Sequence, residues 1–414
     1  MGRSGVDGIN RRVFLVTALA GSAAAQGPAA SFPNLRPMTG GIQPITDEER
    51  RARIEKARRL MAEQKLSAIL CEAGSSLYYY TGTRWTVSGE ALLWVLPEKG
   101  EPGWIVPAAD RDRAGQAIGM GGDIRPAAAS DIFKQTAQFL RERNARAVGL
   151  EEHVRFAVFD GLRREAPQLE SRSADPVTVG CRAIKSPAEI ALLQRANEIT
   201  IAAYKAALAT LREGMTNREL SANIAAAYRA LGVRGGAMAI FGKYTAFPHG
   251  SIAPQQLREG DLVLIDDGCS VEGYQSDITR TTVFGKPSAR QRQVWELERK
   301  AQDAALAACR PGASCESVDA AARRAIADAG FGPGYKLPGL PHRTGHGIGL
   351  DGHEWTYLVK GNQTRIAPGM CFSDEPTIAI PGEFGIRLED CMYVTPAGAR
   401  MFTRQSPAID QPFG

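Results

Sequence analysis

Residues 262–285 read LVLIDDGCSVEGYQSDITRTTVFG, two apolar or β-branched runs joined by the turn-like tetrad at 270–273. Such runs flanking a Gly-containing connection predict a β-hairpin. If the turn is centred between Val271 and Glu272, Asp266 and Asp277 lie opposite each other with Cβ atoms roughly 5 Å apart. Two carboxylates that close repel, so a cation is expected between them. The alternative is a pair of solvated aspartates beside a turn.

Length and composition indicate a two-domain globular protein. The chain has 414 residues, too many for one ordinary core, with 44% hydrophobic and 23% charged residues. A net charge of +5 and the lack of a basic stripe interleaved with aromatics argue against a nucleic-acid partner. Seven scattered cysteines form no disulfide framework, and we expect buried free thiols, including Cys269, Cys371 and Cys391.

The N-terminus has the layout of a secretory signal. Arg11 and Arg12 precede an apolar run at 13–20, and small residues follow to Ala25. The run is too short for a membrane span, and the paired arginines resemble a twin-arginine signal. We therefore expect residues 1–25 to be a signal peptide and the protein to be periplasmic, with no membrane partner. The alternatives are an ordinary secretory signal or, in a cytoplasmic protein, a disordered basic tail.

The remaining chain divides into a linker and two domains. Residues 26–45 are rich in Pro, Gly and Ala and predict a linker. Residues 46–180 predict a layered α/β domain, because strands alternate with helices there. Its expected strands are 67–71, 91–96, 104–106 and 147–151, and its expected helices are 46–64, 131–143 and 154–165. The second domain spans 186–405, with expected helices at 187–211, 216–230, 290–308 and 315–329.

The second domain carries the candidate chemistry in three further stretches. PHRTGHGIGLDGHE (341–354) contains His342, His346 and His353, and CFSDEP (371–376) contains Glu375. In GIRLED (385–390), Arg387 and Glu389 are expected on one strand face. Burying four carboxylates without cations would cost many kcal/mol, which two divalent metal ions would offset. The oxygen-rich set favours Mn(II), with Zn(II) or Co(II) as alternatives.

Taken together, the motifs resemble those of the pita-bread metallopeptidases, the family of methionine aminopeptidase, aminopeptidase P and prolidase. The shared motifs are DDG (266–268), SDITRT (276–281), GHGIG (345–349), EP (375–376) and GIRLED (385–390). The resemblance covers residues 186–405 in order. It extends more loosely to the first domain, as in the proline-specific members. It implies an α/β (α+β) fold, a creatinase-like N-terminal domain followed by a pita-bread catalytic domain.

The resemblance also implies a role for each site residue. Asp266 would bind one metal ion, His346 and Glu375 the other, and Asp277 and Glu389 would bridge both. Glu375 would also act as general acid/base, and His353 would stabilise the oxyanion. His249 and His342 would line the substrate pocket, with His249 also in the catalytic set. Arg387 would bind the substrate's carboxylate.

The expected function is an Xaa-Pro dipeptidase (prolidase), in which a metal-bridging hydroxide attacks the scissile carbonyl of a small peptide with proline in second position. One alternative is an aminopeptidase P that acts on longer peptides, and another is a non-catalytic binding protein on the same fold. Metal-free creatinase-type hydrolysis is disfavoured because all five ligand positions are filled. The resemblance further implies a homodimer.

One position departs from the family pattern. Proline-specific members commonly carry a tyrosine four residues after the glutamate of the EP motif, where this chain has Ala379. The tyrosine is not a ligand, so the metal site is expected to survive. We hypothesise that another donor or a water replaces its hydroxyl.

Overall fold

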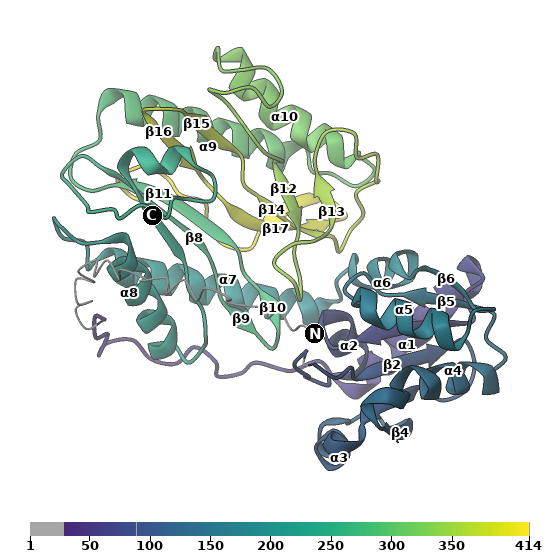
Figure 1. The fold of residues 1–414 in the computed structure, drawn as a ribbon. Helices are drawn as coiled ribbons and strands as arrows, with labels where there is room; N and C mark the ends of the chain where they lie inside the picture. Colours follow the sequence, from purple (N-terminus) through teal and green to yellow (C-terminus); the bar gives the residue numbers. More distant parts are fainter. Residues whose placement is uncertain (1–28, 88, 414) are drawn as a thin grey trace, which may run out of the picture.

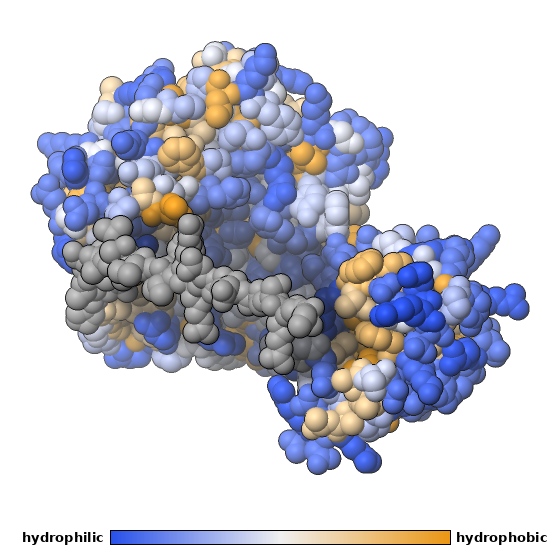
Figure 2. Space-filling view, in the orientation of Figure 1, coloured by the Kyte–Doolittle hydropathy of each residue, from blue (hydrophilic) through white to orange (hydrophobic). Residues whose placement is uncertain are grey.

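The computed structural model describes residues 29–87 and 89–413, which form a smaller N-terminal lobe and a larger C-terminal lobe (Figure 1). The expected signal peptide lies outside the described residues. Within them, no helix combines the length and apolarity that a membrane span requires. All seven cysteines are buried and free, which confirms the prediction of buried thiols. Polar and charged residues dominate the face shown in Figure 2, and apolar residues gather on the smaller lobe beside its junction with the larger one.

The expected linker is docked on the larger lobe in its described part. Residues 29–45 contain neither helix nor strand. Phe32, Leu35 and Met38 pack against the core, and the Met38 amide donates to Leu231 O at 2.9 Å, just beyond helix α8 (Asn217–Ala230). Residues 29–45 therefore run along the surface of the larger lobe before the first domain begins.

The smaller lobe is a six-stranded mixed sheet between two layers of helices. The strands are β1 (Ala68–Glu72), β2 (Leu93–Pro97), β3 (Gly103–Pro107), β4 (Asp123–Ala127), β5 (Ala147–Leu150) and β6 (Glu170–Ser173), in the order β4-β3-β2-β1-β5-β6. The helices are α1 (Asp47–Gln64), α2 (Ser75–Thr81), α3 (Arg111–Ala117), α4 (Ile132–Glu142), α5 (Phe156–Glu165) and α6 (Asp175–Arg182), with short 3-10 turns η1 (Ala108–Asp110) and η2 (Ala129–Asp131).

Alternation along the strands buries both faces of this sheet. On β1, Ile69 and Cys71 join the core cluster under α1, α2 and α6, whereas Ala68 and Leu70 join the cluster under α4 and α5. The sequence prediction missed α2, α3, α6, β4 and β6. Each has only four to eight residues, too few for a periodic pattern to identify.

The larger lobe places its sheets between two helix pairs. Helices α7 (Pro187–Leu208) and α8 cover one side, and α9 (Ala289–Ala308) and α10 (Cys315–Asp328) cover the other (Figure 1). One sheet has the order β11-β8-β7, with β7 (Met238–Phe241), β8 (Leu262–Asp267) and β11 (Ile278–Val283). The other has the order β13-β12-β14-β17-β18, with β12 (Gly345–Gly347), β13 (Glu354–Leu358), β14 (Cys371–Asp374), β17 (Asp390–Thr395) and β18 (Gly398–Met401). Smaller elements are β9 (Ser270–Val271), β10 (Tyr274–Gln275), β15 (Thr377–Ile380), β16 (Phe384–Arg387) and the 3-10 turn η3 (Gly242–Ala246).

The predicted hairpin is present, but its register is shifted from the prediction. Val271 pairs with Tyr274, so Glu272 and Gly273 are the two turn residues, with φ of 49° and 91°. A type I′ hairpin turn requires positive φ at both of its central positions, and here glycine takes the second of them. Asp266 consequently pairs with Thr279 rather than with Asp277. The prediction of directly opposed aspartates was therefore wrong, although their side chains still converge.

Candidate metal centre and active site

All nine residues that the sequence singled out line one cavity of about 680 Å³ in the larger lobe: His249, Asp266, Asp277, His342, His346, His353, Glu375, Arg387 and Glu389. They come from several segments of the chain between residues 249 and 389. Asp266 lies near the end of β8, Asp277 directly before β11, His346 within β12 and Glu375 directly after β14.

Five of these side chains form two overlapping clusters of possible metal ligands. In one, ligand atoms of Asp266, Asp277 and Glu389 lie within 4.8 Å of one another. In the other, the same holds for His346, Glu375 and Glu389. Glu389 belongs to both clusters, so the arrangement is that of two adjacent cation positions sharing a carboxylate.

Local packing explains how β12 presents His346 at the centre of the cavity. The glycines on either side of it let neighbouring strands approach closely. A Cβ on Gly345 would lie 2.1 Å from Ser373 O, and one on Gly347 would lie 2.6 Å from Glu354 O. Any larger residue would push β12 away from β14 or β13, and His346 with it.

His346 is oriented to coordinate a cation through Nε2. Its Nδ1 lies 3.0 Å from Gly347 O, and a carbonyl can only accept, so Nδ1 carries the hydrogen. The Nε2 lone pair then faces Glu375 Oε1 at 3.3 Å and Asp277 Oδ2 at 3.6 Å. Three acceptors turned toward one point require a proton or a metal ion among them.

Around Asp266 and Glu389, too, the carboxylate oxygens outnumber the hydrogens that could balance them. Thr279 Oγ1 lies 2.8 Å from Asp266 Oδ1 and 2.7 Å from Glu389 Oε2, but a hydroxyl has one hydrogen to donate. The other oxygen of Glu389, Oε1, is buried without a hydrogen-bond partner among the described residues. Such an orphaned oxygen is costly unless a cation coordinates it. The residues present therefore fit a pair of divalent ions.

Burial and mutual repulsion perturb the titration of this group. Burial, reinforced by the Asp266 carboxylate, raises the pKa of Asp277 well above its usual range. Burial and the Asp277 carboxylate do the same to the pKa of Glu389, and burial raises the pKa of Glu375 to about 7. Burial also lowers the pKa of His346. All four shifts favour the uncharged form of the side chain. Clustered metal ligands are expected to titrate in this way when protons alone balance their charge.

Arg387 is part of this electrostatic balance. Its side chain is buried, its Nη2 forms an ion pair with Asp266, Nε donates to Thr279 Oγ1 at 3.1 Å, and Nη1 donates to Pro248 O at 3.2 Å. Although Arg387 lines the cavity, each of its nitrogens already contacts a protein group. Its expected contact with the substrate carboxylate stays a prediction.

His353 faces the centre with a hydrogen on Nε2. The rings of His353 and His346 lie 3.9 Å apart between centroids. Arg343 Nη2 lies 3.0 Å from His353 Nδ1, and because a guanidinium only donates, Nδ1 must accept. Burial and the Arg343 charge lower the pKa of His353. The ring is therefore a neutral donor, as an oxyanion-stabilising group must be.

The other two histidines differ in their surroundings. Burial lowers the pKa of His342 to about 4, and its Nε2 contacts Thr377 Oγ1 at 3.0 Å. His249 follows η3 and lines the cavity wall. Sequence reasoning missed six further lining residues: Met238, Asp267, Tyr335, Arg343, Tyr357 and Val359. Arg343 and Asp267 lie inside the quoted motifs and could have been found there, whereas the other four carry no local signal.

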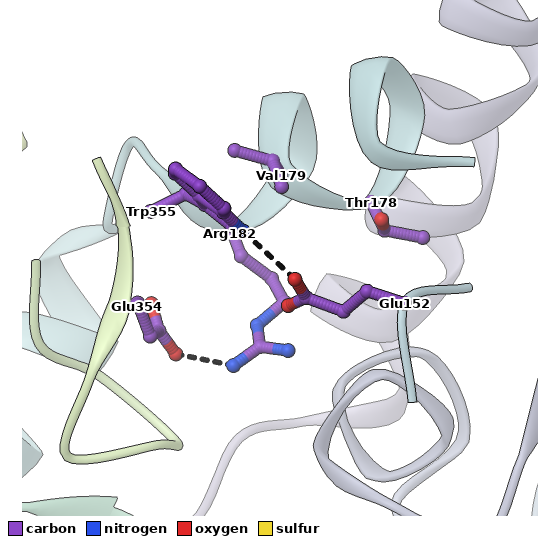
Figure 3. Close-up of a pocket in the computed structure, with 6 residues that line it drawn as sticks. All are labelled: Glu152, Thr178, Val179, Arg182, Glu354 and Trp355. Atoms are coloured by element: carbon purple, nitrogen blue, oxygen red, sulfur yellow. Dashed lines mark hydrogen bonds and ion pairs between the residues drawn. The ribbon is translucent and has the colours of Figure 1, made fainter. Parts of the chain in front are cut away.

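The loop that carries His353 is fastened to the smaller lobe. Glu354 accepts hydrogen bonds from the amides of Leu350 and Asp351 at 2.8 and 3.2 Å and from Lys185 Nζ at 2.8 Å. It also forms an ion pair with Arg182, at the end of α6. Figure 3 shows this pair and a second crossing between the lobes.

That second crossing joins Trp355 Nε1 to Glu152 Oε2 at 2.7 Å (Figure 3). Asp351, in the same loop, adds an ion pair with Arg182 at 2.6 Å. Contacts from the first domain therefore hold both ends of the short loop in which His353 lies.

Comparison with known proteins agrees with this site and fold. Residues 191–396 match the model of metallopeptidase family M24, and residues 53–184 match the creatinase/prolidase N-terminal domain. A probable dipeptidase PepE from Mycobacterium bovis is 32% identical over 361 residues, covering 84% of this chain and 92% of that protein. An Xaa-Pro dipeptidase from Pyrococcus furiosus is 29% identical over 355 residues, covering 85% of this chain and 97% of that protein.

Solved structures show the same architecture. The prolidase from Pyrococcus horikoshii OT3 aligns with a TM-score of 0.75 at 27% identity, covering 85% of this chain and 98% of that one. The expected order of a creatinase-like domain followed by a pita-bread domain is thereby confirmed. The chain belongs to metallopeptidase family M24.

Proposed function

We propose that this metallopeptidase is an Xaa-Pro dipeptidase that works with two divalent ions. Mn(II) is the ion that we expect. The observation that carries the proposal is the pair of ligand clusters sharing Glu389 inside one cavity. The relatives named Xaa-Pro dipeptidase and prolidase, which align over most of both chains, support the choice of substrate. The predominance of carboxylates over imidazole supports Mn(II), because hard oxygen ligands suit that ion.

Asp266, Asp277, His346, Glu375 and Glu389 would hold the two ions. When bound, the ions supply an activated water and polarise the scissile carbonyl. Glu375, directly after β14, would take the proton of the attacking water and give it to the leaving nitrogen. His353 would donate its Nε2 hydrogen to the oxygen on which negative charge develops.

The chemistry of the substrate suits a closed pocket. An Xaa-Pro bond is a tertiary amide without an N–H, and the proline ring fixes φ. An enzyme that reads an extended backbone through its hydrogen bonds fits such a bond poorly. A cavity that reads the free amine, the ring and the carboxylate does not need the missing N–H. His249 and His342, on the cavity wall, would contact the substrate.

A panel of peptides tests the proposal. The purified protein is stripped with a chelator and assayed on Ala-Pro, Ala-Ala and Ala-Pro-Ala after Mn(II), Zn(II) or Co(II) is restored one at a time. We expect hydrolysis confined to Ala-Pro and greatest with Mn(II). Cleavage of Ala-Pro-Ala at a comparable rate would indicate an aminopeptidase P. Full activity in the stripped protein would contradict a metal-dependent reaction.

Two further expectations belong to this proposal. Export through a twin-arginine signal is supported by Arg11, Arg12 and the apolar run after them. Replacing both arginines by lysine and fractionating the cells tests it, because a true signal would then leave the protein unexported. A homodimer is supported by the family resemblance, and light scattering on the eluting protein would show the mass of two chains.

A further inference from the structure

We propose that Asp267 sets the preference for the first residue of the dipeptide, by binding the positively charged side chain of a lysine or arginine at that position. This inference deepens the proposed function and rests on it. Asp267 lines the metal cavity and is exposed. The family resemblance assigns a metal ion to its neighbour Asp266 but gives Asp267 no role.

Asp267 is the acid of the cavity that the metal ions leave over. Of the five acids that line the cavity in the described part of the chain, four belong to the ligand clusters: Asp266, Asp277, Glu375 and Glu389. Within residues 29–87 and 89–413, the Asp267 carboxylate forms no ion pair, and its Oδ1 accepts a hydrogen bond from the adjacent Gly268 amide at 2.9 Å. The carboxylate can therefore bind a cationic group of the substrate.

The backbone at Asp267 departs from regular strand geometry. Successive side chains of a strand point to opposite faces, so Asp266 and Asp267 at the end of β8 would ordinarily diverge. Asp267 instead has a φ of 136°, which residues with a side chain rarely adopt, and both acids line the cavity. The Tyr204 hydroxyl donates to Asp267 O at 2.8 Å, and the Gly236 amide donates to Gly268 O at 3.1 Å. Strained backbone held in place by its surroundings is typical of functional sites.

The reach of the first residue favours its side chain over its amino group as the partner. The amino nitrogen lies about 2.5 Å from the scissile carbonyl carbon, because only Cα separates them, and so it stays beside the metal ions. The four-carbon stem of lysine carries its ammonium about 6 Å from Cα, far enough to reach an acid outside the ligand clusters. Met238, which pairs with Asp266 and lines the same cavity, offers an apolar surface for such a stem.

Two substrates that differ only in this charge test the inference. Wild type and Asp267→Asn, both loaded with Mn(II), are assayed on Lys-Pro and on norleucyl-Pro, whose first side chain has the same four carbons without the ammonium. An exposed ion pair corresponds to at most about fivefold in kcat/KM, and a charge-assisted hydrogen bond shielded from water to about 10- to 100-fold. For an exposed carboxylate that the bound substrate covers, we expect wild type to prefer Lys-Pro by about tenfold. Asp267→Asn should lose this preference through a higher KM for Lys-Pro.

Further variants separate the charge from the backbone. Asp267→Gly removes the carboxylate and adopts the positive φ without strain, so it should lose the preference in the same way. Asp267→Glu keeps the charge on a longer stem and should keep part of the preference. Asp328→Asn alters an exposed acid on α10 and should behave as wild type. Elemental analysis should find the same metal content in every variant.

The outcomes distinguish this inference from the proposed function. Equal kcat/KM of wild type on Lys-Pro and norleucyl-Pro would overturn the inference and leave the dipeptidase activity standing. A preference that survives in both Asp267→Asn and Asp267→Gly would do the same, as would a loss of metal that lowers activity on both substrates alike. Wild-type protein that cleaves neither of these dipeptides nor Ala-Pro would overturn the proposed function and this inference with it.

Discussion

Glu354 is the residue through which the smaller lobe holds the His353 loop, and replacing it by glutamine tests that connection. Its side chain is buried between Arg182 and Lys185 and accepts two loop amides. Glutamine keeps the shape and can still accept one of these hydrogen bonds. It removes the negative charge and leaves Lys185, whose side chain is 2% exposed, without its carboxylate.

The size of the effect follows from the charges. Burial opposes ionisation of Glu354, but Arg182 and Lys185 more than offset it and hold its pKa at about 2, against an ordinary 4.5. That difference corresponds to about 3 kcal/mol of stability. Removing one partner of a buried ion pair costs a similar 3–5 kcal/mol. At roughly 2–4 °C per kcal/mol for a domain of this size, Tm should fall by about 10 °C.

Thermal unfolding at several pH values measures this effect. Because the folded pKa is depressed, the contribution of Glu354 is complete above about pH 5 and is lost as pH falls from the ordinary value toward 2. The deficit of Glu354→Gln should therefore be largest at neutral pH and shrink in acid. Lys185→Met, alone and combined with Glu354→Gln, completes a double-mutant cycle that isolates the coupling between the two.

An exposed carboxylate provides the matched control. Glu383 is 48% exposed and lies 3.5 Å from Arg290. Glu383→Gln should change stability by less than about 1 kcal/mol, as surface pairs do. If Glu354→Gln lowered Tm no more than Glu383→Gln, or by the same amount at every pH, the ion network would not be what fastens the loop.

Three further substitutions address the centre itself. Asp277→Asn should abolish stoichiometric binding of at least one divalent ion, as measured by elemental analysis, and peptidase activity with it; two retained ions would contradict the ligand assignment. His353→Gln should lower kcat about 10²- to 10³-fold with the metal content unchanged, since it removes a donor to the developing charge; near-normal turnover would refute that role. Ala379→Tyr forces a ring into a fully buried position on β15 and should cost about 1–3 kcal/mol of stability without raising turnover. A gain above tenfold on Ala-Pro would show instead that nothing replaces the missing hydroxyl.

Sequence signals located the helices where their ends carry capping chemistry. Thr46, Ser186 and Thr216 each accept a hydrogen bond from the third helical amide, at the starts of the helices expected at 46–64, 187–211 and 216–230. The last two are complete capping boxes. A cap is a local interaction and can be read from four consecutive residues. Short elements such as α2 and β6 have no such marker and were missed.

Sequence reasoning could identify the residues that form the site but not the arrangement of their atoms. Acids in apolar strands signal burial, so Asp266, Asp277 and Glu389 could be expected to share a cation. Which atoms face each other depends on register and on strands distant in sequence. The hairpin register is an example, because it is set by which residues adopt positive φ at the turn.

The connection between the lobes carried no sequence signal. Arg182 and Glu354 are 172 positions apart, and each by itself is typical of a solvated surface residue. Only the docking of the two lobes brings them together and buries them. The tautomer of His353 is similar, because it depends on where Arg343 lies rather than on the motif alone.

Metal analysis of the purified protein tests the central claim most directly, since the buried carboxylates and His346 are held to exist for two cations. Elemental analysis after dialysis, paired with Ala-Pro hydrolysis before and after chelation, should show two divalent ions per chain and activity that disappears and returns with them. Substoichiometric metal in a protein that cleaves Ala-Pro equally well in the presence of chelator would contradict it.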